Sequence, residues 1–280
     1  ERARVAEHLS DGFAAEPLIP LDLFKNPMVR AGAATGFLSG MAMFGAISFI
    51  PLYIQAVVGA TATQAGFVLT PFVLGWVAFS ILSARLVLRV GYRGVVVAGM
   101  ASLTFSFLLL SEWDQSLTRL GAVRDIVFAG FGMGMVMVPM LIAVQSAVPK
   151  RDLGIATSTV QFFRTIGGAV GVAVMGAAMA HRLQTELAGL LAASGPGTRL
   201  AAQVRELVAQ PDLVVNPATR ETLAPALVAH IRLALANALH GVFVVGLIVC
   251  VVALASSFLV PSGRARDLAR AEEAPSTPGS

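Results

Sequence analysis

Three ionisable side chains stand inside long apolar stretches of this sequence, where a charge is costly. Asp125 and its neighbour Arg124 lie near the start of one stretch, and Arg164 lies well inside the next. Ionisable residues at membrane depth are rare, usually face a protein interior or a wet cavity, and often mark a solute or proton pathway. Asp125 and Arg164 are therefore the charged candidates for a functional site.

Uncharged side chains in the same stretches form a second group of candidates. An amide in lipid needs a hydrogen-bonding partner, so Gln145 and Gln161 either join helices or contact a solute. Methionine and aromatic residues supply adaptable apolar surface that suits varied ligands, and ordinary packing is the alternative for each of them. These candidates for lining a substrate cavity are Met41, Phe44, Phe49, Tyr53, Trp76, Met133 and Met137.

Several classes of chemistry find no support in the pattern. The four histidines and the single cysteine, Cys250, are scattered without the spacing of a metal site, so we expect no metal and no cofactor. No Ser-His-Asp or paired-carboxylate arrangement falls at a common depth, so an enzyme is not expected. The pI near 10.0 comes from arginines that flank apolar stretches and does not imply nucleic-acid binding.

Composition points to a membrane protein. The chain is 56% hydrophobic and 13% charged, whereas soluble domains carry about 25% charged residues. Several apolar runs exceed the roughly 18 residues that mark a membrane-spanning helix, and they are too long and continuous for barrel strands. We predict an all-α membrane protein whose six transmembrane helices form one bundle, at about 31–57, 63–87, 94–112, 122–147, 156–181 and 236–260.

Basic residues predict the sidedness of these spans. Arg85, Arg89 and Arg93 crowd the turn between the second and third spans, and Lys25 with Arg30 and Lys150 with Arg151 fall on the same side. Since cytoplasmic loops carry the excess of lysine and arginine, we place that side in the cytoplasm of a multi-pass protein of the cell membrane. The predicted order is a cytoplasmic linker (1–30), five transmembrane helices (31–181), an extracytoplasmic helical loop (182–235), the last transmembrane helix (236–260) and a disordered cytoplasmic tail (261–280).

Glycines repeat every fourth residue within three of the spans. Gly32, Gly36 and Gly40 share one helix face, and two further pairs repeat the spacing, Gly130 with Gly134 and Gly167 with Gly171. Such faces let helix backbones approach closely. Close packing between helices is the plain interpretation, and a lining role in a moving bundle overlaps with it.

Four segments carry a resemblance to a known family. "RVGYRG" resembles the cytoplasmic loop signature of the major facilitator superfamily, Asp-Arg-x-Gly-x-Arg: Arg89, Gly91 and Arg93 match it, and Leu88 stands where the acid would be. "PLIPLDLFKNPMVR", "VPKRDLGIATSTVQFFRTIGGAVGVAVMG" and "LANALHGVFVVGLIVCVVALASSFLVP" resemble, in order, segments from the C-terminal half of fourteen-span drug:proton antiporters.

The resemblance implies a fold, a function and partners. The six spans correspond to the last six of such a transporter, and the expected partners are its N-terminal half, the lipid bilayer, a small-molecule substrate and protons. The implied function is proton-coupled efflux of hydrophobic or cationic drugs by alternating access, with the principal proton-coupling acids in the first half. A transporter of another solute (lipid, siderophore or sugar) and a non-transporting membrane scaffold or sensor are the alternatives.

Arg164 needs a partner at its depth, and the sequence leaves the partner open. Asp125 is the carboxylate inside the spans, but its helix runs the opposite way and places it nearer the outer surface. Backbone carbonyls, Gln145 or an acid from the first half are the other candidates.

Overall fold

The computed structural model describes residues 21–114, 117–193, 202–205 and 225–261, and these residues contain helices and no strand. The elements are η1 (Leu21–Lys25), α2 (Pro27–Tyr53) with its π-helical continuation η2 (Ile54–Val58), α3 (Ala62–Phe67), α4 (Thr70–Val90), α5 (Tyr92–Ser111), α6 (Arg119–Ser146), η3 (Lys150–Asp152), α7 (Leu153–Ala193) and α11 (Pro225–Ser257). Six helical stretches are long and apolar enough to cross a membrane. The prediction of an all-α membrane protein with six spans is confirmed.

The helices start where the sequence supplies capping groups. The Asn26 side chain accepts a hydrogen bond from the backbone N–H of Met28 at 2.8 Å, and Pro27 occupies the first position of α2. Thr61 and Gln64 form a reciprocal capping box at the start of α3. The second predicted span is therefore two helices, because α3 ends at Phe67 and α4 begins at Thr70, beside Pro71.

Close backbone contacts hold α2 against α7. A β-carbon on Gly36 would lie 3.1 Å from the carbonyl oxygen of Val160, and one on Gly40 would overlap the carbonyl of Arg164. The predicted glycine face of α2 is therefore a helix-packing face. Two other glycine pairs make the same kind of contact, Gly167 and Gly171 against α2, and Gly130 and Gly134 against α4.

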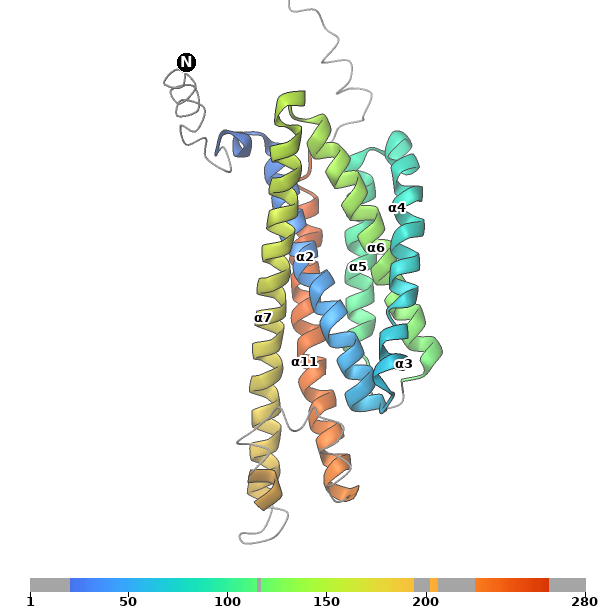
Figure 1. Ribbon diagram of the computed structural model, residues 1–280, viewed down its shortest axis with the longest axis vertical. Coiled ribbons are helices and arrows are strands. Elements are labelled where there is room, and N and C mark those ends of the chain that lie inside the picture. The colour runs from blue at the N-terminus through green and yellow to red at the C-terminus, as the bar shows by residue number, and fades with distance from the viewer. Residues whose placement is uncertain (1–20, 115–116, 194–201, 206–224, 262–280) are drawn as a thin grey trace, which may run out of the picture.

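The six spans form a bundle with two main groups of packed helices, joined by α11. α2 packs chiefly on α7, while α4 and α5 both pack on α6; α11 runs behind them and contacts α2, α5 and α7 (Figure 1). The largest apolar cluster lies between these helices and includes Ile50, Met133 and Phe243. Cys250 of α11 is fully buried within it.

The fifth and sixth spans extend far past their predicted ends. α7 has 41 residues and is about 61 Å long at 1.5 Å per residue, twice the hydrocarbon thickness of about 30 Å. The helices continue past the predicted span ends at 181 and 236: Leu183 and Leu187 of α7 belong to the same apolar cluster as Leu227 and Ile231 of α11, and all four are at most 2% exposed. In Figure 1 both helices project below the rest of the bundle.

The rest of the predicted loop and both termini can be compared only in part. Residues 182–193 and 225–235 belong to α7 and α11 rather than to a separate loop. Within the predicted linker, residues 21–25 form η1 and α2 begins at Pro27. Residues 1–20, most of 194–224 and residues 262–280, including the predicted tail, lie outside the described residues.

A single residue turns the chain between α4 and α5. Gly91 has φ +83° and ψ 166°, a conformation that glycine adopts and other residues avoid. The next residue, Tyr92, is buried, and its hydroxyl lies 3.4 Å from the Ser146 hydroxyl at the end of α6. Arg85, Arg89 and Arg93 are exposed around this turn, at the same end of the bundle as the start of α2 and the α6–α7 connection (Figure 1).

Candidate functional site

A cavity of about 160 Å³ lies where four helices meet, α2, α4, α6 and α7. Its walls are mostly aliphatic and come from Val136 to Leu141 of α6 and Val160 of α7. The polar, aromatic or sulfur-containing side chains that line it are Thr35 and Ser39 from α2, Trp76 from α4, Met137 from α6, and Gln161 and Arg164 from α7. An apolar cavity with a few convergent polar groups is the usual form of a small-molecule site.

Arg164 provides the charge in this cavity. It lies about 16 Å along α7 from Leu153, counted at 1.5 Å per residue. One guanidinium nitrogen, Nη1, donates to the thioether sulfur of Met137 at 2.9 Å, and Nε is buried without a hydrogen-bonding partner among the described residues. A thioether is a weak acceptor and carries no charge, so this contact does not neutralise the guanidinium.

The hydroxyls of α2 complete the polar part of the cavity. Thr35 is 1% exposed, and its hydroxyl has no hydrogen-bonding partner among the described residues. Ser39 satisfies its own hydroxyl by donating to the carbonyl of Gly36 at 3.2 Å. Buried polar groups are normally hydrogen-bonded, so the free Thr35 hydroxyl is a group for which the structure supplies no protein partner.

Asp125 does not pair with Arg164 and does not line this cavity. Its carboxylate is 2% exposed and accepts hydrogen bonds from Trp113 Nε1 at 2.9 Å and from Arg124 Nε at 2.7 Å. The Arg124 side chain itself is 62% exposed, so the ion pair reaches the surface. Both carboxylate oxygens are therefore occupied, near the start of α6.

Aromatic packing surrounds the Asp125 site. The Trp113 ring lies 5.2 Å from that of Tyr53 and 5.7 Å from that of Phe243, centroid to centroid. Asp125 thus connects the α5–α6 loop to α6 and, through Trp113, to α2 and α11. This arrangement gives the buried carboxylate two hydrogen-bonding partners within the bundle.

The structure separates the sequence candidates into three groups. Trp76, Met137, Gln161 and Arg164 meet in the cavity. Gln145 donates to the Thr157 hydroxyl at 3.1 Å and so joins α6 to α7, which removes it as the partner of Arg164. The remaining candidates pack inside the bundle, Met41 and Phe44 against glycines of α7, and Phe49, Tyr53 and Met133 in the apolar core.

Sequence reasoning missed Thr35 and Ser39. Both are hydroxyl residues four positions apart in an otherwise apolar span, so they share one face of α2. That spacing was the available signal. It does not reveal which neighbour the face meets, and only the packing of α2 against α6 and α7 places it at the cavity.

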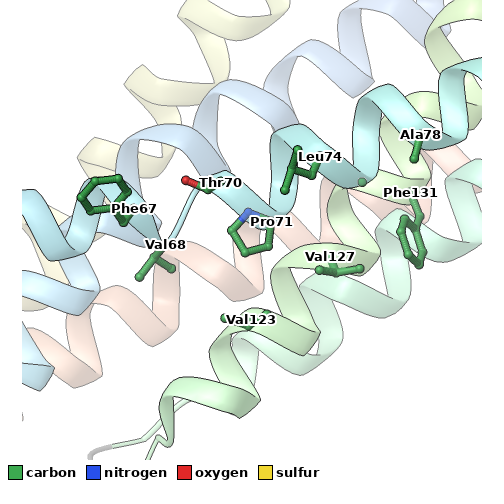
Figure 2. A pocket seen from close by; sticks show the side chains of 10 residues that line it. Phe67, Val68, Thr70, Pro71, Leu74, Ala78, Val123, Val127 and Phe131 are labelled. Carbon is green, nitrogen blue, oxygen red and sulfur yellow. The ribbon is translucent and has the colours of Figure 1, made fainter.

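A larger groove, of about 600 Å³, runs between α4 and α6. Figure 2 shows that Phe67, Pro71 and Leu74 line one side and that Val127 and Phe131 line the other. Thr70 is the one lining residue with a polar side chain. The groove has no charge that would orient a ligand, so its size alone does not make it the better candidate.

Comparison with known proteins places the bundle in a family. Residues 2–172 match the family model described as Major Facilitator Superfamily. This chain belongs to the major facilitator superfamily. The match covers more than half of the chain and includes the turn at Gly91. Of the four helices that line the cavity, it covers α2, α4 and α6 completely and α7 in part.

Curated relatives of this superfamily member include proteins named for multidrug transport and for drug resistance. It is 33% identical over 263 residues to the multidrug transporter protein MdtP of Bacillus subtilis, across 89% of this chain and 49% of that protein. A tetracycline resistance determinant of Streptomyces rimosus is 30% identical over 177 residues, across 63% of this chain and 51% of the relative. Multidrug resistance protein 3 of Bacillus subtilis is 27% identical over 260 residues, across 91% of this chain and 50% of that protein. The chain thus spans about half the length of these relatives, and its family is one of transporters rather than enzymes.

Proposed function

We propose that this chain is the C-terminal half of a proton-coupled efflux antiporter of the fourteen-span drug-exporting kind, located in the cell membrane. The observation that carries the proposal is the cavity between α2, α4, α6 and α7, which holds an arginine at membrane depth. In a two-bundle transporter the substrate site lies near the middle of the membrane between the two halves. This cavity is then one wall of that site.

The second half is proposed to cover the two least buried helices. Among the 18 most apolar consecutive residues of each span, 17% are buried in the span that contains α4 and 22% in the span that contains α7. The corresponding share in the α2 span is 61%. Both helices border the cavity, α4 with Trp76 and α7 with Arg164. A second bundle packed against α4 and α7 would close the cavity, and lipid would cover the other flanks.

The proposed cargo is a drug-like small molecule. The relatives named for multidrug transport and tetracycline resistance match along much of this chain. The wall offers Trp76, Met137 and aliphatic side chains, which is the adaptable apolar surface that varied ligands need. Among the described residues no carboxylate lines the cavity, so in this proposal the acids that bind protons come from the second half.

The test is dye efflux from cells that lack their own exporters. We expect the whole transporter to expel an amphipathic dye, and we expect a protonophore to stop this efflux. Residues 1–280 alone should insert in the membrane without efflux, because one bundle forms one wall of the site. Proton-dependent efflux by this chain alone would contradict the half-transporter proposal, and a normally inserted whole protein that expels no dye would favour the scaffold.

A further inference from the structure

We propose that the cavity receives an anionic group, so that the substrates are amphipathic organic acids in which a carboxylate or similar oxyanion binds Arg164 and Thr35. This inference rests on the proposed transport function and narrows its substrate class. It differs from the expectation of hydrophobic or cationic drugs, because the charge that lines this wall is positive.

Two unsatisfied donors point to an acceptor that the protein does not supply. Arg164 Nε and the Thr35 hydroxyl are both buried without partners among the described residues, and both residues line the same cavity. They come from different helices, α7 and α2, whose backbones are in contact at Gly36 and Gly40. An oxyanion has enough lone pairs to accept from both donors at once.

The charge balance favours the same ligand. A guanidinium stays protonated in proteins, and a buried charge is costly unless it is paired and hydrogen-bonded. No carboxylate lines the cavity among the described residues, and Asp125, the candidate acid within a span, is occupied by Trp113 and Arg124. The cavity therefore has a net positive charge, which would repel a cationic drug and attract an anion.

The dimensions of the cavity fit the charged end of such a substrate. Drug-sized ligands need pockets of about 300–1,000 Å³, whereas this cavity measures about 160 Å³. It can hold a carboxylate with an attached ring. The rest of the molecule would extend past Trp76 and the exposed amide of Gln161 toward the second half of the transporter.

The experiment compares two probes that differ in one group and carry no cation, a fluorescent coumarin that bears a free carboxylate and the methyl ester of the same coumarin. Binding to the whole transporter in nanodiscs of zwitterionic lipid is measured by fluorescence polarisation. We expect the carboxylate probe to bind at least about tenfold more tightly than the ester, since a hydrogen bond to a charged group contributes about 1.5–3 kcal/mol. An ester that binds as tightly as the acid would overturn the inference.

Variants then assign the preference to named side chains. We expect Arg164→Gln to weaken binding of the carboxylate probe by about 10–100-fold and to change binding of the ester little. Arg164→Lys keeps the charge without the planar fork, so it should bind the acid with intermediate affinity. Thr35→Val removes one hydroxyl at nearly constant shape, so it should weaken binding of the carboxylate probe by a few-fold. Arg85→Gln, an exposed arginine outside the cavity, is the matched control.

The outcomes separate this inference from the proposed function. Efflux of the ester without efflux or preferential binding of the acid would leave a transporter and overturn the anionic substrate class. Arg164-dependent binding of the acid without efflux of either probe would support the anion site and contradict transport. If an acid of the second half neutralises Arg164, the wild-type protein will show no preference for the carboxylate, and the inference fails.

Discussion

Gly40 of α2 lies directly against the backbone carbonyl of Arg164 in α7, so closely that a β-carbon at position 40 would overlap that oxygen. The contact fixes the turn of α7 that carries the guanidinium. The place of a charge in the cavity thus depends on the absence of a side chain on the neighbouring helix.

Gly40→Ala tests this dependence. The new methyl group must push α7 away, which moves Arg164 relative to Thr35 and costs about 1–3 kcal/mol in packing. We expect lower thermal stability in nanodiscs and weaker binding of the carboxylate probe. Gly154→Ala is the matched control, because a β-carbon on Gly154, also in α7, would have no atom within 4 Å. Equal behaviour of the two variants would show that the close contact does not position Arg164.

Asp125 is expected to matter for stability rather than for the substrate. Asp125→Ala removes the acceptor of Trp113 Nε1 and leaves that buried donor unsatisfied, at a cost of about 1–3 kcal/mol. Asp125→Asn keeps an acceptor oxygen for Trp113, so it should lower the free energy of unfolding by less than Asp125→Ala does. Thermal unfolding of both variants, together with dye efflux, checks this order. Loss of efflux by a fully stable Asp125→Asn protein would instead assign the carboxylate to proton coupling.

Sidedness can be tested with two cysteine substitutions in a transporter that has no other reactive cysteine. Tyr92 is buried, so the exposed neighbour Arg93 is the better site in the basic turn. We expect Arg93→Cys to react with a membrane-impermeant thiol reagent only after cells are opened. Thr63→Cys, exposed at the opposite end of the bundle, should react in intact cells. The reverse pattern would invert the topology.

We expect packing between the projecting parts of α7 and α11 to contribute to the stability of the protein. Ile231 is fully buried there, whereas Leu233 on the same helix is 50% exposed. Ile231→Ala should lower the unfolding temperature, because a buried Ile→Ala change costs about 2–5 kcal/mol. Leu233→Ala should change it little. Similar unfolding temperatures for the two variants would show that the extensions do not contribute to stability.

The length of the apolar runs was sufficient to predict the six spans, and the four-residue spacing of the glycines was sufficient to predict their faces, because both depend on neighbours along one helix. The ends of α7 and α11 were not predictable in the same way. The predicted limits were 181 and 236, but both helices continue past them, where Leu183 and Ile231 join the same apolar cluster. The pairing of Trp113 with Asp125 and the meeting of Thr35 with Arg164 depend on contacts between elements, which no single stretch of sequence contains.

The backbone contacts at the glycines divide the bundle into two stiff plates, one made of α2 and α7 and the other of α4, α5 and α6. Within each plate the helices touch through main-chain atoms and have little freedom to slide. The cavity lies where the two plates meet. Helix α11 packs on both plates, through α2 and α7 on one side and α5 on the other. A molecule bound in the cavity would contact both plates and press them apart. We therefore expect ligand binding to change the angle between the two plates.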